Sequence, residues 1–289
     1  LGGRRIAIAI ERERALANCK PAPAASMTAD DLYCHSQSMT TVMALVAKAA
    51  SMRAGVTIRG EEGTGRQIVA RAIHGSGSGA SGRFVAVDCA ALDAEDLEQE
   101  LFGNISVSVA RTAVPAPERP PAQPRSVDRL GRSSRVLDSA GGTLYLQNLV
   151  EAPERVQARL ARVLRDREAT LAATNDIVPL DLRVISSLDD AGTAAVEDGK
   201  VREDLWRRVS VIRIDMPPLR NRREDIPALA NYLMRDVAGA QRLPARVLSR
   251  PALSLLSALP WRGNATELRG LLEHVVSAAP DGEITVDDV

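Results

Sequence analysis

The octapeptide GEEGTGRQ at residues 60–67 has the composition of a loop that could bind phosphate. Gly60, Gly63 and Gly65 carry no side chain, which lets backbone N–H groups converge on an anion. A short β-branched run at 56–59 precedes the loop and a helical pattern follows it, so the N-terminus of a helix would add positive potential. By themselves the glycines fit a tight strand-to-helix turn without a ligand equally well.

Arg66 supplies the positive charge of this glycine loop. Arginine keeps the charge of a lysine but is longer, planar and forked, so the two are not interchangeable in a close-fitting loop. Lys20, Lys48 and Lys200 are the only lysines of the chain, so an arginine at a basic position is weak evidence of functional selection. The candidate nucleotide-contacting residues are Gly60, Glu61, Glu62, Gly63, Thr64, Gly65, Arg66 and Gln67.

The composition is that of a soluble globular protein. The 289 residues are 45% hydrophobic and 26% charged, enough for one large or two modest cores. With 37 basic and 37 acidic side chains, the chain has no global field that would attract nucleic acid or an anionic membrane. No apolar run reaches the roughly 18 residues of a membrane span, and no signal peptide is visible, so a cytoplasmic protein is expected.

Cysteine and histidine usage points to neither disulfides nor metal. Cys19, Cys34 and Cys89 are odd in number and widely spaced, which is typical of a reducing compartment. The three histidines have no ligand-like spacing with one another or with the cysteines. We therefore expect no metal site built from these residues.

Short hydrophobic strands alternate with helical patterns through much of the chain. This alternation predicts an α/β fold in which a parallel sheet is covered by helices on both faces. The helix at 155–167 is rich in arginine, but acidic residues are interspersed and one face is apolar, so a solvated core helix is a better interpretation than a DNA-binding element. The predicted strands are 56–59, 84–88, 141–149, 181–187 and 209–215.

Composition changes suggest the organisation of the chain. Residues 1–31 are predicted to be a linker or the tail of a preceding domain, and residues 32–216 the α/β part. Within it, residues 104–140 contain VPAPERPPAQP, which cannot form a regular helix or a central strand, so an irregular excursion is expected. From residue 217 to 289 the strand patterns stop, which predicts a small helical domain.

From about Leu32 to Val289 the chain resembles the AAA+ domain of bacterial enhancer-binding proteins, the sigma-54-dependent transcription activators. The resemblance implies an AAA+ P-loop αβα sandwich followed by a helical lid, which assembles into a ring, hydrolyses ATP and remodels the sigma-54 polymerase. It rests on GEEGTGRQIVARAIH, FVAVDCAALDAEDLEQELFG, GGTLYLQNL, VQARLARVLRDRE, VREDLWRRVSVIRIDMPPLRNRREDIPALA and LPWRGNATELRGLLEHVV.

The chain departs from this family at the positions that carry hydrolysis. Arg66 stands where the family has the lysine that reaches the β- and γ-phosphates. Gln147 and Asn148 occupy the positions of an adjacent aspartate and glutamate, which organise magnesium and polarise the attacking water. An amide neither takes a proton from water nor gives negative charge to Mg²⁺. Loss of both carboxylates argues against hydrolysis.

Three further positions differ in the same direction. Asp189 aligns with the family's polar sensor asparagine, where its charge would repel a γ-phosphate. Thr266 replaces the arginine expected in the lid, within NATEL. The family's sigma-contacting loop, GAFTGA, should follow ELFG, but ISVSVARTAVPAPERPPAQP occupies that region.

Arg202 and Arg208 match the family's arginine fingers, which reach the nucleotide of a neighbouring subunit. The alternative is that both are solvated helix charges paired with Glu203 or Asp204, a kind of pair that contributes little stability. Arg207 is adjacent and complicates the assignment.

These observations favour a hydrolysis-deficient AAA+ module of a transcription regulator, which acts through oligomerisation and nucleotide or ligand sensing. ATP or ADP is the expected cofactor, with weak support for Mg²⁺. Expected partners are further copies of the chain, in a ring or dimer, and RNA polymerase or a sigma factor. DNA would bind only through a helix-turn-helix domain outside this sequence, and no membrane is expected.

Two alternatives stay open. The chain could be a slow ATPase that remodels a sigma-54 polymerase complex, with water and metal held by Asp88 or Asp138. It could also be a scaffold whose loop binds no nucleotide, which predicts that nucleotide leaves its thermal stability unchanged.

Overall fold

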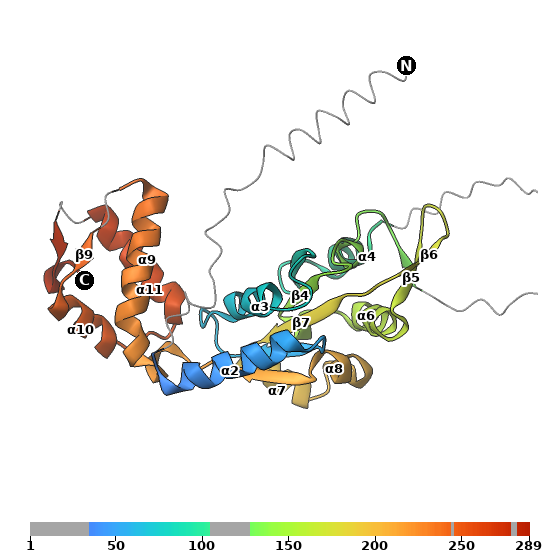
Figure 1. Ribbon diagram of the computed structural model, residues 1–289, viewed down its shortest axis with the longest axis horizontal. Coiled ribbons are helices and arrows are strands. Elements are labelled where there is room, and N and C mark those ends of the chain that lie inside the picture. Colours follow the sequence, from blue (N-terminus) through green and yellow to red (C-terminus); the bar gives the residue numbers. More distant parts are fainter. Residues whose placement is uncertain (1–34, 105–127, 244–245, 279–281) are drawn as a thin grey trace, which may run out of the picture.

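The computed structural model describes residues 35–104, 128–243, 246–278 and 282–289. An α/β part carries the glycine loop, and a helical part lies beside it along the long axis of the molecule (Figure 1). We call residues 217–289, where described, the lid. The segment predicted to be a linker and the quoted proline-rich sequence lie outside the described residues.

A five-stranded sheet, in the order β2-β4-β7-β1-β8, forms the centre of the α/β part. Every neighbouring pair is parallel, so all carboxyl ends meet at one edge, and the predicted parallel αβα architecture is confirmed. The strands are β1 (Val56–Arg59), β2 (Phe84–Asp88), β4 (Thr143–Gln147), β7 (Arg183–Leu188) and β8 (Ile212–Asp215).

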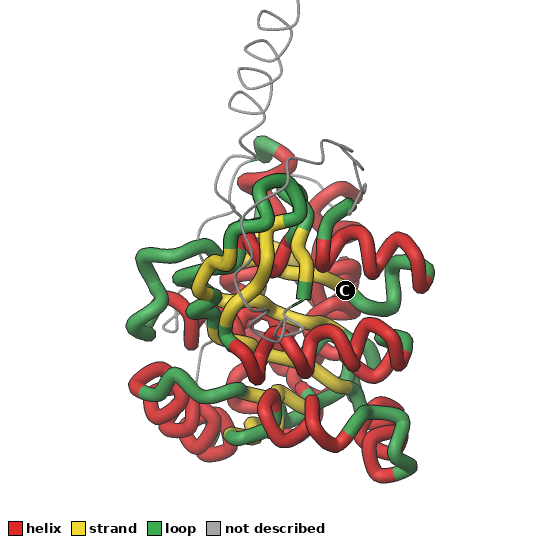
Figure 2. Tube along the Cα trace, turned by 90° about the vertical axis from the view of Figure 1, so that its right-hand side faces the viewer, coloured by secondary structure: helices red, strands yellow, loops and turns green. Residues whose placement is uncertain are grey.

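Helices cover both faces of the sheet, which lies between them in Figure 2. Side chains alternate along β4: Leu144 and Leu146 pack into one core, and Tyr145 packs into the other. Burying each such leucine contributes about 1.5–3 kcal/mol. The first core includes α4 (Ala94–Phe102), α6 (Glu154–Asp166) and α8 (Glu203–Val209), and the second includes α2 (Gln37–Ser51) and α3 (Arg66–Gly75).

The irregular excursion predicted for residues 104–140 is too long at its C-terminal end. Residues 128–140 are ordered, because Leu130 is fully buried and Ser134 both donates to the carbonyl of Leu101 (2.7 Å) and caps a short helix. The strand that contains Leu130 joins a second, three-stranded sheet. Its elements are β3 (Arg129–Leu130), β5 (Glu168–Leu171) and β6 (Ile177–Pro179), and the short helix is α5 (Arg135–Asp138).

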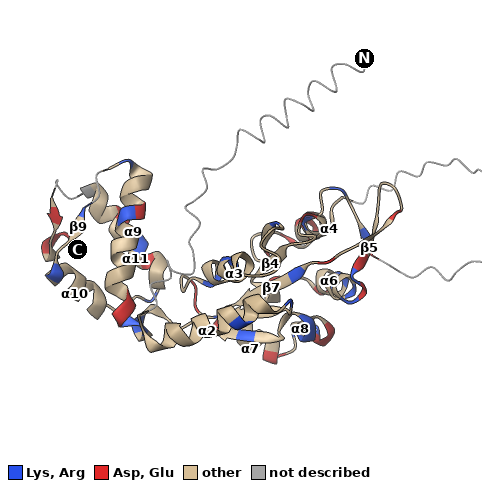
Figure 3. Cartoon of the chain, in the orientation of Figure 1, with Lys and Arg blue, Asp and Glu red and all other residues tan. Residues whose placement is uncertain are grey.

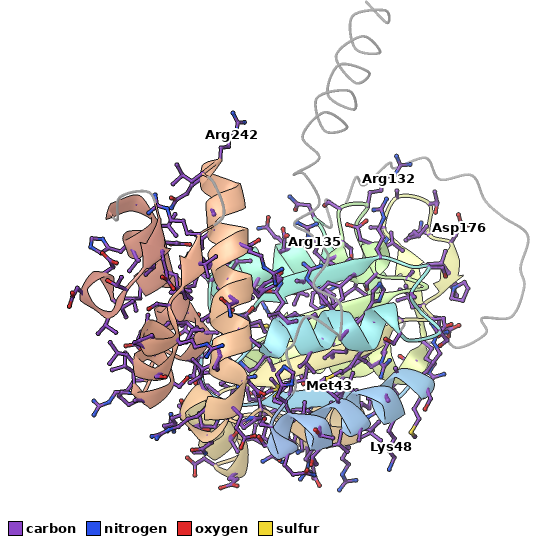
Figure 4. The ribbon with its side chains drawn as sticks, turned by 60° about the vertical axis from the view of Figure 1, so that its left-hand side comes forward. Met43, Lys48, Arg132, Arg135, Asp176 and Arg242 are labelled. Atoms are coloured by element: carbon purple, nitrogen blue, oxygen red, sulfur yellow. The ribbon has the colours of Figure 1, made fainter. Side chains whose placement is uncertain are left out.

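The lid is built around three helices with their own hydrophobic core. The prediction that strands stop at residue 217 is wrong, because two short strands pair in parallel and bury Leu248 and Ile284. Arg242 ends the first helix in a left-handed conformation (φ 57°) and projects from its tip (Figure 4). The lid elements are α9 (Ile226–Gln241), β9 (Val247–Leu248), α10 (Arg250–Ala258), α11 (Asn264–Ala278) and β10 (Glu283–Ile284).

Short elements complete the described ranges. They are η2 (Leu149–Glu151), α7 (Asp190–Glu197), η3 (Leu219–Asn221), η4 (Arg223–Asp225) and η5 (Val286–Asp288). None of the helices in these ranges is long and apolar enough to cross a membrane.

Candidate nucleotide-binding site

The glycine loop, residues 60–67, connects β1 to α3 at the carboxyl edge of the sheet. Gly63 and Gly65 have φ angles of 76° and 97°, which only glycine adopts without strain. Gly65 caps α3 without a side-chain hydrogen bond. Among the described residues, the amides of Gly65, Arg66 and Gln67 have no protein acceptor, so these N–H groups are available to an anion.

Arg66 is only 8% exposed and points into the cleft beside the loop. Its Nη1 is buried and has no hydrogen-bond partner in the part of the chain that the structure describes. A buried, unpaired guanidinium nitrogen is costly unless a ligand supplies the acceptor. The loop therefore offers an anion both backbone donors and a pre-placed positive charge.

The cleft at this edge of the sheet has a volume of about 430 Å³. It brings the predicted residues Gln147, Asn148 and Asp189 together with Arg66, although they come from three different strand ends. The predicted constellation thus converges in space. The lining is Glu62, Arg66, Asp88, Cys89, Ala90, Leu92, Gln147, Asn148, Val150, Glu151, Leu188, Asp189 and Gly192.

Asp88 and Asn148 are joined across the cleft floor. Asp88 ends β2 and lies opposite Gln147 of the neighbouring strand β4. The Nδ2 group of Asn148 donates to Oδ1 of Asp88 over 3.0 Å. Asn148 has a left-handed backbone (φ 52°), which asparagine tolerates better than most residues. The amide at position 148 thus has a carboxylate partner in the next strand.

Asp189 lines the cleft, but its carboxylate is hydrogen-bonded to the backbone of the helix that follows it. Oδ1 accepts the backbone N–H of Gly192 over 2.6 Å and caps the N-terminus of α7. A carboxylate at a helix N-terminus is stabilised by the helix dipole. The expected repulsion of a γ-phosphate by Asp189 stays a prediction.

The lid holds the outer side of the glycine loop through Asn264. This residue is fully buried and donates from Nδ2 to Oε2 of Glu61 (3.1 Å) and to the carbonyl of Glu62 (2.8 Å). Its own Oδ1 accepts the N–H of Leu219 (2.7 Å), and the N–H of Ala265 donates to the carbonyl of Gly63 (3.1 Å). Sequence reasoning missed this role, although GNATEL was part of the recognised lid motif.

Three further lid residues lie at the loop. Arg220 makes a two-pronged ion pair with Glu61 at 2.5 and 2.8 Å, and Nη2 of Arg222 donates to the carbonyl of Thr64 over 3.0 Å. A Cβ atom added at Gly63 would lie 2.9 Å from Oγ1 of Thr266, so Thr266 faces the loop. Thr266 therefore brings a hydroxyl rather than a cation to the loop.

Arg202 and Arg208 do not line the cleft. Arg202 pairs with Asp204 (3.1 Å) and Glu154 (3.4 Å), and Nη1 of Arg208 donates to the carbonyl of Asp204 (2.6 Å). The backbone of Arg208 lies against Gly55, at the opposite edge of the sheet from the glycine loop. These contacts fit solvated helix charges and leave a role toward a second copy as a prediction.

The arginines of α6 are likewise paired with acidic side chains. Arg159 contacts Glu98 (2.7 Å) and Asp128 (3.1 Å), while Arg155 and Arg162 add further pairs to the same two acids. Figure 3 shows both signs of charge on α6 and α8. This interspersed pattern favours the solvated-helix interpretation over a basic surface for DNA.

Cys89 lines the cleft and Tyr145 lies in the core on one face of the sheet, and burial disfavours the ionised form of each. Burial raises the pKa of the Cys89 thiol to about 12, and the carboxylates of Asp88 and Glu151 contribute to the rise. Burial also raises the pKa of the Tyr145 hydroxyl, against the effect of its hydrogen bond to Ser187. No group of three or more potential metal-ligating His, Cys, Asp or Glu side chains occurs among the described residues.

A parallel sheet with a glycine loop between an inner strand and a helix, followed by a helical lid, defines an AAA+ P-loop fold. Family models match both parts: the Sigma-54 interaction domain matches residues 32–111 and 128–215, and the AAA+ ATPase lid domain matches residues 220–289. The chain belongs to the Sigma-54 interaction domain family, as its motifs predicted.

Curated relatives agree with this family. The chain is 34% identical over 260 residues to the Nif-specific regulatory protein of Azospirillum brasilense, covering 90% of this chain and 39% of the relative. It is 36% identical over 242 residues to the regulatory protein AtoC of Escherichia coli, covering 84% and 49%. The chain thus spans about half or less of the length of these relatives.

Solved structures give the same result. NtrX from Brucella abortus in complex with ADP superposes with a TM-score of 0.70 at 30% identity, over 88% of this chain and 54% of that one. NtrX in complex with ATP gives a TM-score of 0.69 over 88% and 55%. Both complexes are of proteins similar to this chain.

Proposed function

We propose that this chain is the AAA+ module of a sigma-54-type transcription regulator that binds ATP or ADP in the cleft and hydrolyses ATP poorly. The observation that carries nucleotide binding is the pairing of free amides at Gly65, Arg66 and Gln67 with the buried, unpartnered Nη1 of Arg66. The similar NtrX chains, which have been solved with ADP and with ATP, support the choice of ligand.

Poor hydrolysis follows from the residues at the strand ends. Gln147 and Asn148 bring amides to the cleft where the family has carboxylates, and an amide neither removes a proton from water nor neutralises a cation. The residues present also fit a magnesium ion poorly. Gln147 brings an amide where the family has a metal-organising carboxylate, and Gln67, not a serine or threonine, follows Arg66 in the loop. We infer that Mg²⁺ adds little to nucleotide affinity here.

The regulatory output would come from self-association, in a ring or a dimer, controlled by nucleotide or another ligand. Arg202 and Arg208 are the proposed contacts to a second copy, where they would exchange their pairing within the chain for a neighbour's phosphates. Contact with a sigma factor or RNA polymerase is proposed from the family alone.

Restoring the carboxylates tests the hydrolysis claim. A simple Q147D/N148E variant would place a second carboxylate against Asp88, whose Oδ1 lies 3.0 Å from the present amide, so the variant also carries Asp88→Asn. We expect this triple variant to release phosphate at least about 100-fold faster than the parent chain, the scale of a lost catalytic group. Equal rates, with the same nucleotide affinity, would show that positions 147 and 148 do not limit hydrolysis.

A further inference from the structure

Asp88 presents an unoccupied carboxylate oxygen to the cleft. Its Oδ1 accepts two hydrogen bonds, from Nδ2 of Asn148 and from the backbone N–H of Ala90, each over 3.0 Å. Among the described residues no donor bonds to its Oδ2. The two bonds to Oδ1 fix the orientation of the carboxylate, while Oδ2 keeps its capacity to accept a proton.

The other acids of the cleft are less suited to this task. Glu62 and Glu151 are exposed, so their side chains are solvated and free to rotate. Asp189 is half-buried, but it caps α7 through Gly192. Asp88 is half-buried, and its carboxylate is oriented by the side chain of Asn148. Residue 148 is the position where the family has its glutamate.

Asp88 and Arg66 also act on the same part of the cleft. Both line it, and their charges have opposite effects on the pKa of the buried Tyr145 hydroxyl, which Arg66 lowers and Asp88 raises. Both charges therefore lie close enough to one buried hydroxyl of the sheet to affect it. A phosphate held by Arg66 and the loop amides would have Asp88 as the nearby acid fixed by the fold.

We propose that Asp88 is the general base of the slow ATP hydrolysis that remains in this chain, a role that rests on the proposed nucleotide binding. As the oxygen of water bonds to the γ-phosphorus, Oδ2 of Asp88 takes one proton from that water. The bond from the γ-phosphorus to the bridging oxygen breaks, and ADP leaves with its electron pair. The proton then passes from Asp88 to solvent. The family has its carboxylate at position 148, whereas here the carboxylate belongs to Asp88, the hydrogen-bond partner of Asn148.

The test compares Asp88→Asn with the parent chain in two measurements, nucleotide affinity by calorimetry and phosphate release at saturating ATP. Asparagine keeps the size and an acceptor oxygen, so we expect the dissociation constant of ATP to change by less than about threefold. Phosphate release should fall about 100-fold, the scale of a lost general base. Asp176→Asn is the matched control, because Asp176 is exposed and lies outside the cleft.

A second variant separates chemistry from structure. Exchanging the two residues, in Asp88→Asn with Asn148→Asp, keeps the hydrogen-bonded pair and one negative charge, and we expect it to recover release to within about tenfold of the parent. Unchanged release in Asp88→Asn, or a parent chain that binds ATP and releases no phosphate, overturns the assignment. A parent chain that binds no nucleotide overturns the proposed function itself and the assignment with it.

Discussion

Arg66 has the placement expected of an anion-binding residue. Its guanidinium is buried beside the glycine loop, and one of its nitrogens has no hydrogen-bond partner in the described structure. Arg183 also has one unpaired buried nitrogen, but it donates to the carbonyl of Ala49 from another, whereas the side chain of Arg66 makes no hydrogen bond or ion pair with the described residues. The lysine-to-arginine change relative to the family thus keeps a positive charge in the cleft.

Arg66→Ala tests this interpretation. We expect the dissociation constants of ATP and ADP to rise about 10- to 100-fold, because a charged hydrogen bond contributes about 1.5–3 kcal/mol. Without nucleotide the melting temperature should stay the same or rise, because the variant removes a buried, unpaired polar group. Calorimetry and thermal melts measure the two effects, and a destabilised variant with normal affinity would mark Arg66 as structural.

At the residue scale the sequence predicted which groups share the cleft but not how they pair. Gln147, Asn148 and Asp189 follow strands of a parallel sheet, so their convergence follows from topology. The bond from Asn148 to Asp88 depends on the order β2-β4 and on the left-handed backbone at Asn148. Periodicity alone contains neither piece of information, since it does not specify which strands are neighbours.

At the scale of elements, the conformation of the glycine loop depends on its contact with the lid. Gly63 has φ 76°, and a Cβ atom there would overlap the carbonyl oxygen of Gly263 in the lid. Gly141 has almost the same φ, 75°, but nothing lies within 4 Å of an added Cβ. The two positions share the backbone strain and differ in the lid contact.

Gly63→Ala and Gly141→Ala therefore form a matched pair. We expect Gly141→Ala to lower the free energy of unfolding by about 1–2 kcal/mol through left-handed strain. Gly63→Ala should cost about 1–3 kcal/mol more, because the lid must also shift. Chemical denaturation measures both values, and equal losses would mean that the lid does not press on the loop.

The ion pair between Glu61 and Arg220 makes lid docking sensitive to pH. Hydrogen bonds from Arg220 lower the pKa of Glu61 below its ordinary value of 4.5, against the effect of burial, and Asn264 adds to the lowering. A lowered carboxyl pKa stabilises the fold above the ordinary value, and this contribution is lost as the pH falls through the lowered value.

Glu61→Gln should therefore be less stable than the parent near pH 7, by about 1 kcal/mol for a partly exposed pair. The difference should shrink as the pH falls below about 4.5, where the parent loses the same charge. Exposed Glu197→Gln serves as the control in denaturation curves at several pH values. A difference that is independent of pH would assign the effect of Glu61→Gln to packing instead.

Elements with strong periodicity were predictable from the sequence, and short ones were not. The sheet strands and α6 lie within about three residues of their predicted bounds. The strand predicted from residue 209 begins only at Ile212, since Val209 ends α8. The strands β9 and β10 span two residues each, too short for any period to be visible. Residues 128–140 were included in the irregular excursion because prolines precede them. Leu130 nevertheless joins the three-stranded sheet, and Ser134 bonds to α4.

At the scale of the whole molecule, the α/β part and the lid meet at the glycine loop. Asn264, Arg220 and Arg222 contact the loop from the lid, and Asp225 accepts hydrogen bonds from the backbone of His35 and Ser36 at the start of α2 (2.7 and 2.8 Å). The lid is therefore bonded both to the glycine loop and to the residues that directly precede α2. The proposed nucleotide binding would reach the lid through these bonds.

Nucleotide binding by the purified chain is the measurement that tests the central claim most directly. Calorimetric titration with ATP and ADP, with and without Mg²⁺, would be followed by a phosphate-release assay on the same sample. We predict that both nucleotides bind with little dependence on Mg²⁺. We also predict that the parent chain releases phosphate more slowly than the triple variant Q147D/N148E/D88N. No binding at about 1 mM nucleotide would mean that the free energy of binding is weaker than about −4 kcal/mol. That result would contradict the proposed nucleotide binding and favour a scaffold. Rapid magnesium-dependent release would contradict the claim of poor hydrolysis.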